Sequence, residues 1–266
     1  MASAGFIVTG NMGGALARAA AKSGLADELL LANRTAAKAE RLAREIGGSA
    51  VRVVSSREAA AAADILFLGV KPQMLEDLLE EIGETIRARS DRFVIVSMIA
   101  GKDLETLGLL LGKDRPVIRI MPNIPVAVGA GVTLFCCSQS VTAEEKERFV
   151  RLMGASGMVA ELDEHLLAAA SGVTGCGPAF AAMFVEALAD GAVACGLPRK
   201  QALAYGAQML LGSARLLLET GEHPGELKDR VCSPGGSTIQ GVRKLEERAF
   251  RAAVTDAVIA TYEKEF

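Results

Sequence analysis

Short apolar runs alternate with charged, alanine-rich stretches through about residue 160 of the chain. Runs of this kind are typical of parallel strands that are buried on both faces. The stretches between them, such as Thr35–Ile46 and Pro72–Arg89, are long enough for the crossover helices that parallel strands require. The pattern therefore predicts an α/β fold with a doubly wound parallel sheet. The predicted strands are Gly5–Thr9, Leu29–Asn33, Val51–Val54, Ile65–Val70, Phe93–Ile99 and Val117–Met121.

Two further strand-like runs are expected to complete this sheet. The runs Gly131–Cys137 and Met158–Leu162 have strand character and flank a helical stretch, Thr142–Met153. We therefore place the first domain over residues 1–162 and a second domain over residues 163–266.

After Leu162 the pattern changes to long segments rich in alanine and leucine, with helical periodicity. From His165 to Cys195 the only charged residues are Glu186 and Asp190. A helix that is apolar nearly all round has to be buried. We expect an all-α domain buried against a second copy of the chain in a homodimer, the alternative being a compact monomer whose helices bury each other. Glycines and the two acids interrupt the segment too often for a membrane span.

Composition narrows the classes of partner. The chain is 50% hydrophobic and 23% charged, as expected for a folded globular protein. A net charge of −3, few aromatic residues and no tryptophan argue against binding to nucleic acid. The five cysteines lack paired C-x-x-C spacing, which argues against disulfides and a metal site. We expect all five to be buried thiols, and the lack of a leader before the first strand predicts a cytoplasmic protein. They are Cys136, Cys137, Cys176, Cys195 and Cys232.

A glycine-rich turn follows the first predicted strand and leads into a helix-like stretch, Ala15–Ser23. In a dinucleotide fingerprint the glycines allow a tight turn, a close approach to the pyrophosphate and close packing of helix on strand. Gly10 and Gly13 fill the last two glycine positions, whereas Val8 occupies the first. The structural alternative is a plain strand-to-helix turn. The predicted pyrophosphate-binding residues are Gly10, Asn11, Met12 and Gly13.

The end of the second predicted strand carries no acid. An NAD site usually has Asp or Glu there, whereas a 2′-phosphate requires a guanidinium and hydroxyl donors. Arg34 and Thr35, with Asn33 beside them, supply such donors, and this predicts NADPH, with NADH as the alternative cofactor. The structural alternative is a solvated arginine with Thr35 as a helix N-cap.

Two more loops follow the carboxyl ends of predicted strands, where ligands of open α/β sheets bind. One carries Val70, Lys71 and Pro72, and the other carries Asn123. We expect these residues to border a nicotinamide. Lys71 is alternatively a surface charge, and Pro72 suits the first turn of a helix.

A small, hydroxyl-bearing turn lies near the C-terminus and leads into an apparent helix. The free N–H groups and the positive end of a helix dipole make such a turn a receptor for a carboxylate, without any basic residue. The alternative is a structural loop with a serine N-cap and a proline in the first turn. The predicted substrate-binding residues are Ser233, Gly235, Gly236, Ser237 and Thr238.

Five motifs together resemble the pyrroline-5-carboxylate reductase family, and they stand in family order over nearly the whole chain. The most specific is the C-terminal signature Asp229–Thr238. The others are Gly5-Phe6-Ile7 with Gly10–Gly13, Val70-Lys71-Pro72-Gln73, Arg119–Pro125 and Thr174–Phe180.

This resemblance implies NADPH-dependent reduction of 1-pyrroline-5-carboxylate to L-proline, the last step of proline biosynthesis. It also implies a Rossmann domain, a helical domain that interlocks with its twin, and rings of dimers in many members. We expect Thr238 to hydrogen-bond the ring nitrogen, and Lys71 to be the second catalytic residue. The chain departs from the family at Val8, at Cys176 and at Gly221, where some relatives carry an acid able to pair with Lys71. Glu222 is adjacent and is a candidate replacement for that acid.

Two other functions remain open. A 3-hydroxyacid-type dehydrogenase would need a catalytic lysine in the helical domain, and neither Lys200 nor Lys228 stands in a pattern typical of that family. The second alternative is a weakly active or regulatory paralogue that binds NADPH. His165 and His223 are expected to be structural.

Overall fold

The computed structural model describes residues 3–8 and 10–265, and all of their side chains except those of Val8 and Glu265. The end of the first predicted strand at Thr9 and the role of the Val8 side chain lie outside the described residues. The chain forms two compact units, residues 1–171 and 172–266. The domain boundary predicted after Leu162 lies before this division and stays a prediction.

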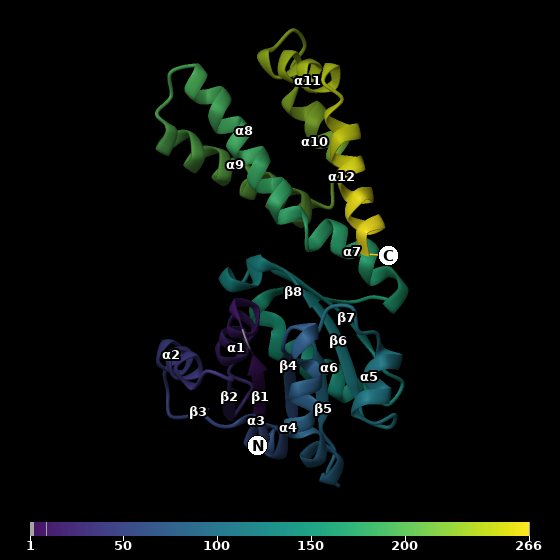
Figure 1. Ribbon diagram of the computed structural model, residues 1–266. Coiled ribbons are helices and arrows are strands. Elements are labelled where there is room, and N and C mark those ends of the chain that lie inside the picture. Colours follow the sequence, from purple (N-terminus) through teal and green to yellow (C-terminus); the bar gives the residue numbers. More distant parts are fainter. Residues whose placement is uncertain (1–2, 9, 266) are drawn as a thin grey trace. The chain divides into compact units, whose positions relative to one another are not determined.

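The first unit is built on one eight-stranded sheet in the order β3-β2-β1-β4-β5-β6-β7-β8. Figure 1 shows this sheet with its helices around it. Every neighbouring pair is parallel except β6 and β7, which are antiparallel. The predicted parallel sheet is therefore confirmed, and the pairing of β7 adds an antiparallel element to it. The strands are β1 (Ser3–Val8), β2 (Glu28–Ala32), β3 (Val51–Val53), β4 (Ile65–Gly69), β5 (Val94–Ser97), β6 (Val117–Pro122), β7 (Gly131–Cys137) and β8 (Gly157–Glu161).

Helices cover both faces of this sheet, as a doubly wound fold requires. One buried cluster joins the sheet to α1, α2 and α6, and a second joins its other face to α3, α4 and α5. The helices are α1 (Asn11–Ser23), α2 (Ala36–Ile46), α3 (Ser56–Ala62), α4 (Leu75–Ala88), α5 (Leu104–Leu111) and α6 (Ala143–Met153), with short 3₁₀ turns η1 (Pro72–Met74), η2 (Ile124–Val128), η3 (Gly154–Ser156) and η4 (Glu164–Leu166).

The strand register aligns the loops that matter for function. A row of neighbours crosses the sheet through Ala32, Ile7, Leu68, Ser97 and Arg119. The carboxyl ends of β2, β1, β4, β5 and β6 therefore lie side by side along one edge. The strand order reverses between β1 and β4, which makes the crevice beyond these two strands the expected ligand site.

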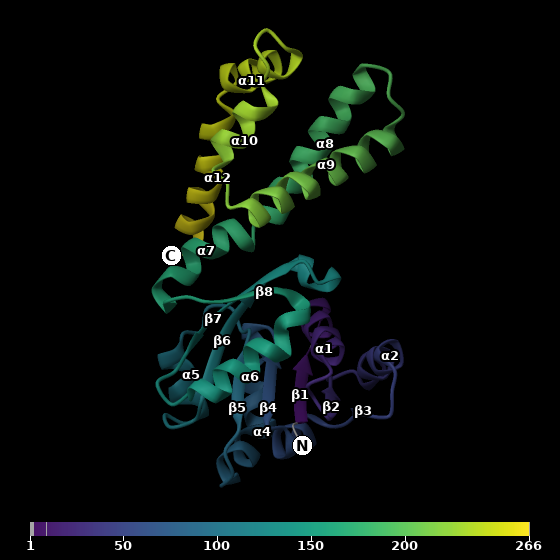
Figure 2. The same cartoon turned by 180° about the vertical axis from the view of Figure 1, so that it is seen from behind.

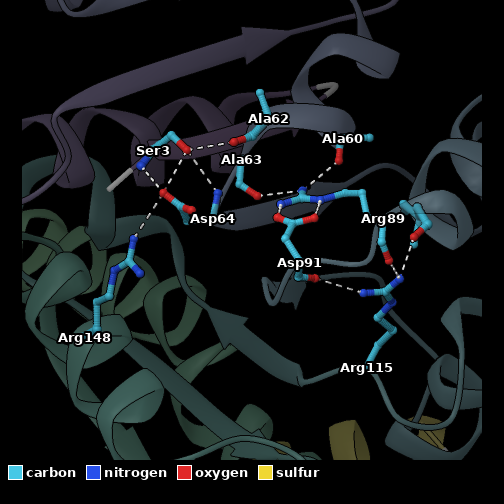
Figure 3. A network of polar contacts seen from close by, with 10 residues as sticks. Ser3, Ala60, Ala62, Ala63, Asp64, Arg89, Asp91, Arg115 and Arg148 are labelled. Atoms are coloured by element: carbon cyan, nitrogen blue, oxygen red, sulfur yellow. Dashed lines mark hydrogen bonds and ion pairs between the residues drawn. The ribbon is translucent and has the colours of Figure 1, made fainter. Parts of the chain in front are cut away.

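At the opposite edge, two partly buried arginines donate to backbone carbonyls near the amino ends of the strands, as Figure 3 shows. The Arg89 guanidinium donates to the carbonyls of Ala60 and Ala63 at 2.9 and 2.8 Å, pairs with Asp91, and lies 3.7 Å from the Phe93 ring centroid. Arg115 donates to the carbonyl of Arg89 at 2.6 Å. These bonds satisfy carbonyls at the ends of α3 and α4, so the network stabilises the scaffold at a distance from the candidate site.

The second unit contains only helices among its described residues, as the sequence predicts. The helices are α8 (Gly177–Ala194), α9 (Arg199–Thr220), α10 (Pro224–Val231), α11 (Ser237–Glu247) and α12 (Phe250–Glu265), while α7 (Leu167–Thr174) crosses from one unit to the other. Figures 1 and 2 show α8 and α9 as a helical hairpin.

Many large apolar side chains of this unit are exposed within a single chain. Met183 on α8 is 68% exposed, and Leu218 on α9 is 74% exposed. Other large apolar residues on α8, α9 and α12 are exposed as well. A lone helical unit of this kind leaves far more apolar surface in water than a stable monomer usually does. The compact monomer, in which the helices bury each other, is therefore not what the structure shows.

One helical stretch among the described residues, Glu164–Ala194, is long and apolar enough to cross a membrane by length and composition. This is weak evidence for a membrane span, because helices buried in protein interiors pass the same test. The stretch is also broken between α7 and α8, where Gly175 and Cys176 are not helical.

The prediction that all five cysteines are buried is wrong. All five are free thiols, but only Cys136 is buried and Cys195 is exposed. Cys195 is the C-cap of α8, in the unit whose apolar surface is exposed. The apolar character of this helix therefore does not mean that Cys195 is buried within one chain. Burial raises the pKa of Cys136 to about 12 and that of Cys137 to about 11, so both stay protonated near neutral pH.

Replacement of Gly157 by alanine is expected to destabilise the first unit. Gly157 has φ +121°, and a Cβ there would lie 2.2 Å from the Gly131 carbonyl oxygen of the paired strand. We expect Gly157→Ala to lower the free energy of unfolding by about 2 kcal/mol or more. The matched control is Gly154→Ala, where a Cβ meets nothing within 4 Å. Denaturant unfolding measures both variants, and equal losses would contradict this account.

The Arg89–Asp91 pair is expected to shape stability in acid. The hydrogen bond from Arg89 lowers the pKa of Asp91 from 3.8 to about 2. A lowered folded-state pKa gives stability that is present above about pH 4 and is lost as the pH falls towards about 2. Asp91→Asn should therefore make the melting temperature fall less steeply across this window, measured by thermal unfolding at each pH. The control is the exposed Asp114→Asn, and an unchanged acid slope for Asp91→Asn would count against the pair.

Candidate functional site

The first part of the site is the amino end of α1. The helix begins at Asn11, earlier than the predicted start at Ala15, so Asn11, Met12 and Gly13 form its first turn. Gly10 is the N-cap and provides no side chain to bond the free N–H groups. A Cβ at Gly10 would meet nothing within 4 Å, so the approach to this turn is open. An open, uncapped helix start fits a phosphate group.

The second part is the turn after β2. The Asn33 Oδ1 atom accepts a hydrogen bond from Thr35 N at 3.1 Å, which shapes the turn as an Asx turn. Thr35 is the N-cap of α2, but its side chain makes no capping hydrogen bond. Arg34 is exposed and has no ion pair within residues 3–8 and 10–265. The hydroxyl and the guanidinium are therefore available to a second anionic group beside the first.

The third part is the loop after β4, which neighbours β1 at the switch point. Gly69 pairs with Val8 in the sheet, and Val70 behind it is buried. Lys71 is exposed and is the N-cap of η1, with Pro72 in the first turn. No ion pair of Lys71 occurs in the part of the chain that the structure describes. The Lys71 ammonium group thus lies in the loop next to the switch point.

Asn123, after β6, has a structural function. Its Oδ1 atom accepts from Val132 N at 2.8 Å, and its N–H donates to the Val132 carbonyl at 3.2 Å. These bonds close the loop that joins β6 to β7. The contact with a cofactor that we expect for Asn123 stays a prediction, and the neighbouring Ile124 is 72% exposed at the same edge.

Capping distinguishes the helices at this edge. The side chains of Ser55 and Asp103 accept hydrogen bonds from the first turns of α3 and α5. The N-caps of α1, α2 and η1, which are Gly10, Thr35 and Lys71, do not. Unsatisfied N–H donors therefore gather around the switch point, where an anionic ligand can satisfy them.

The loop after β5 is not among the loops that the sequence predicts for the site. Met98–Gly101 follows β5 between the Lys71 loop and the Asn123 loop, and Gly101 has φ +69°. It therefore borders the same crevice. The predicted strand Phe93–Ile99 extends past the end of β5 into this loop. The other loops were identified by their place after the carboxyl end of a strand, and here the predicted strand covers that place.

The second unit contains the predicted anion-binding turn. Gly236 N donates to the Ser233 carbonyl at 3.0 Å, with Pro234 and Gly235 between them. Gly235 has φ +69°, so the segment is a type II turn, which requires glycine at this place. A Cβ at Gly236 would lie 2.3 Å from Ser233 Oγ, so a larger residue there would require the Ser233 hydroxyl to rotate away.

The turn opens directly into α11. Its N-cap is Gly236, and Ser237 and Thr238 are the first two helical residues, both exposed. Their N–H groups have no carbonyl acceptor within the helix. The structural alternative of a serine N-cap with proline in the first turn is wrong here, because glycine is the N-cap and Pro234 precedes it. The arrangement offers N–H and hydroxyl donors to a carboxylate.

The remaining candidates have structural positions. His223 is the N-cap of α10, and its Nδ1 atom accepts from Gly225 N at 3.0 Å. His165 lies in η4, and Cys176 precedes α8. Within the described residues no three His, Cys, Asp or Glu side chains are placed to hold a metal ion. The candidate residues thus fall into two separate groups, one around the switch point of the first unit and one in the turn before α11 of the second unit.

Family comparisons match both units. The family described as "Pyrroline-5-carboxylate reductase dimerisation" matches residues 164–265. The family described as "NADP oxidoreductase coenzyme F420-dependent" matches residues 3–101. The pyrroline-5-carboxylate reductase of Escherichia coli is 42% identical over 98% of this chain and 96% of its own length. Pyrroline-5-carboxylate reductase 2 of Homo sapiens is 38% identical over 97% of this chain and 81% of its own length.

Solved structures give the same result. A pyrroline-5-carboxylate reductase from Coxiella burnetii has a TM-score of 0.90 and 28% identity, covering 98% of this chain and 96% of that one. The Plasmodium falciparum pyrroline carboxylate reductase, solved with NADP bound, has a TM-score of 0.84 and 27% identity, covering 99% and 97%. The doubly wound first domain and the helical second domain are therefore confirmed.

The uncapped turn at Arg34 predicts discrimination between the two nicotinamide cofactors. Arg34→Ala removes the guanidinium, so it should weaken NADPH binding about tenfold or more and leave NADH binding nearly unchanged. The control is Arg44→Ala, which removes an exposed arginine in the last turn of α2, the helix that follows Arg34. Fluorescence titration with each cofactor measures the two affinities, and an equal loss for both cofactors would show that Arg34 does not contact a 2′-phosphate.

Proposed function

This chain belongs to the pyrroline-5-carboxylate reductase family, and we propose that it reduces 1-pyrroline-5-carboxylate to L-proline with NADPH through the two groups of residues described above. The observation that carries the assignment of roles is the turn Ser233–Thr238, an uncapped helix start with several hydroxyls and no basic residue. A small carboxylate is the ligand that such a turn suits best.

The residues of the first unit fit an NADPH molecule. Gly10, Asn11, Met12 and Gly13 would hold the pyrophosphate at the start of α1, because their turn is open and uncapped. Arg34 and Thr35 would hold the 2′-phosphate, with Asn33 fixing the turn. Val70, Lys71, Pro72 and Asn123 would border the nicotinamide. When bound, NADPH supplies the hydride, and the same site admits NADH with lower affinity.

The residues of the second unit hold and orient the substrate. Ser237 and Thr238 would donate their backbone N–H groups to the carboxylate, and Ser233 would add its hydroxyl. Gly235 and Gly236 give the turn its shape. Fixing the carboxylate in this way aligns the C=N bond with the hydride donor, and such positioning accounts for several orders of magnitude in rate.

Two residues are proposed to act on the reacting atoms. The hydride adds to the carbon of the C=N bond, and one proton has to end on the nitrogen. We assign the Thr238 hydroxyl to a hydrogen bond with that nitrogen. Threonine is a poor acid, so the proton originates from water or from a protonated iminium. Lys71, exposed after β4 and without an ion pair in the described part of the chain, is assigned as the second catalytic residue.

The helical unit mediates oligomerisation, since the dimerisation family matches it and its apolar side chains are exposed in one chain. We propose a homodimer formed through α8, α9 and α12, assembled further into a ring of dimers. We also retain residues 1–162 and 163–266 as the functional domains and the cytoplasm as the compartment.

Turnover of NADPH with pyrroline-5-carboxylate, followed by nicotinamide absorbance, tests the function. The purified protein should oxidise NADPH faster than NADH at equal concentrations. Thr238→Ala should lower kcat by about 100-fold, the usual scale for loss of a proton-transfer contact. Thr238→Ser, which keeps the hydroxyl, should retain most activity and is the matched control.

Two outcomes would contradict the proposal. Tight NADPH binding without oxidation would identify a regulatory paralogue. Full activity in Thr238→Ala would remove the hydroxyl from the mechanism while leaving the reaction in place.

A further inference from the structure

We propose that Glu222 and Arg230 form a positioning pair that holds the substrate turn Ser233–Thr238 in place. The inference rests on the proposed function of that turn. It concerns two residues outside the candidate site, at the two ends of α10.

The ion pair joins the two ends of α10. Glu222 precedes the N-cap of this eight-residue helix, and Arg230 lies in its last turn. The Arg230 Nη2 atom lies 2.8 Å from Glu222 Oε2. An isolated helix this short is unstable in water, so α10 depends on contacts at its ends.

The Glu222 carboxylate depends on this ion pair. The Glu222 side chain is 17% exposed, and its Oε2 atom is buried and accepts no well-aligned hydrogen bond within the described residues. The Arg230 guanidinium is therefore its compensating charge. A carboxylate withdrawn from water is unfavourable unless such a charge stays close, so it constrains where Arg230 can lie.

The backbone before α10 is held as well. Gly221, with φ +66°, ends α9, and its N–H donates to the Leu217 carbonyl at 2.9 Å. Glu222 N donates to Thr220 Oγ1 at 3.2 Å. Glu222 is thus fixed to the end of α9, a helix of 22 residues, and transmits that position to α10.

The backbone after α10 continues directly into the substrate turn, with only Cys232 between them. Cys232 N donates to the Asp229 carbonyl at 3.0 Å, and the type II turn begins at the next residue, Ser233. Any displacement of the Arg230 end of α10 therefore moves the Ser233 hydroxyl and the start of α11. The pair thereby links α9 to the carboxylate receptor.

The ion pair also bears on whether Glu222 replaces the acid that some relatives carry at the position of Gly221. Glu222 is not a free acid available to Lys71, because its charge is matched by Arg230. Its function in this chain is to position the turn.

Steady-state kinetics with both substrates tests the pair. Glu222→Gln keeps the shape but removes the charge, so it should raise the KM for the imine about tenfold while the KM for NADPH changes less than twofold. The control is Glu226→Gln on the same helix, and it should change neither constant. Glu226 is exposed and has no ion pair among the described residues. The double variant Glu222→Arg with Arg230→Glu restores opposite charges and should recover part of the lost affinity.

Other outcomes would overturn the proposal. Equal changes in both KM values would indicate general damage, and an unchanged imine KM would show that the turn does not depend on the pair. If Glu222→Gln does not fold, Arg230→Lys provides the same comparison with the charge kept and the guanidinium lost. If the wild-type protein does not reduce the imine, the proposed function fails, and L-proline binding to these variants by calorimetry then tests the pair alone.

Discussion

Unpaired N–H groups at the starts of helices are the constraint on which both parts of the candidate site depend. Each helix leaves its first N–H groups without an internal acceptor, and a protein normally satisfies them with a side-chain cap. This chain does so at α3, α5, α6 and α10. At α1 and α11 it places glycine instead, and at α2 a threonine whose hydroxyl is not used. The donors left over are those that the phosphates of a cofactor and the carboxylate of a substrate can satisfy.

The two units position their candidate residues by different means. The first unit relies on strand register, which brings loops distant in sequence to one edge of a rigid sheet and fixes that sheet at its far edge with arginines. The second unit holds its turn between two helices, within a domain whose apolar side chains are exposed in a single chain. Oligomerisation buries such side chains, so we expect the rigidity of the turn Ser233–Thr238 to depend on assembly as well as on the proposed Glu222–Arg230 pair.

Most of the fold was predictable, because buried parallel strands have an unmistakable apolar pattern. The first and last residues of the predicted strands differ from the observed ones by few positions, and Gly131–Cys137 agrees fully. The start of α1 was not predictable, because glycine and asparagine are weak helix formers and hide its first turn. The bonds of Asn123 to Val132 and of Glu222 to Arg230 join residues that no local pattern relates. The prediction that Cys195 is buried was wrong. An apolar helix indicates that its surface is covered, but in this unit a single chain does not cover it.

The central claim is that the uncapped start of α11 receives the substrate carboxylate. A crystal structure of the protein with NADP and L-proline tests it most directly. The account predicts the proline carboxylate within hydrogen-bond distance of the Ser237 and Thr238 N–H groups, with the ring nitrogen facing the Thr238 hydroxyl. A carboxylate bound by a lysine or arginine away from this turn would contradict it.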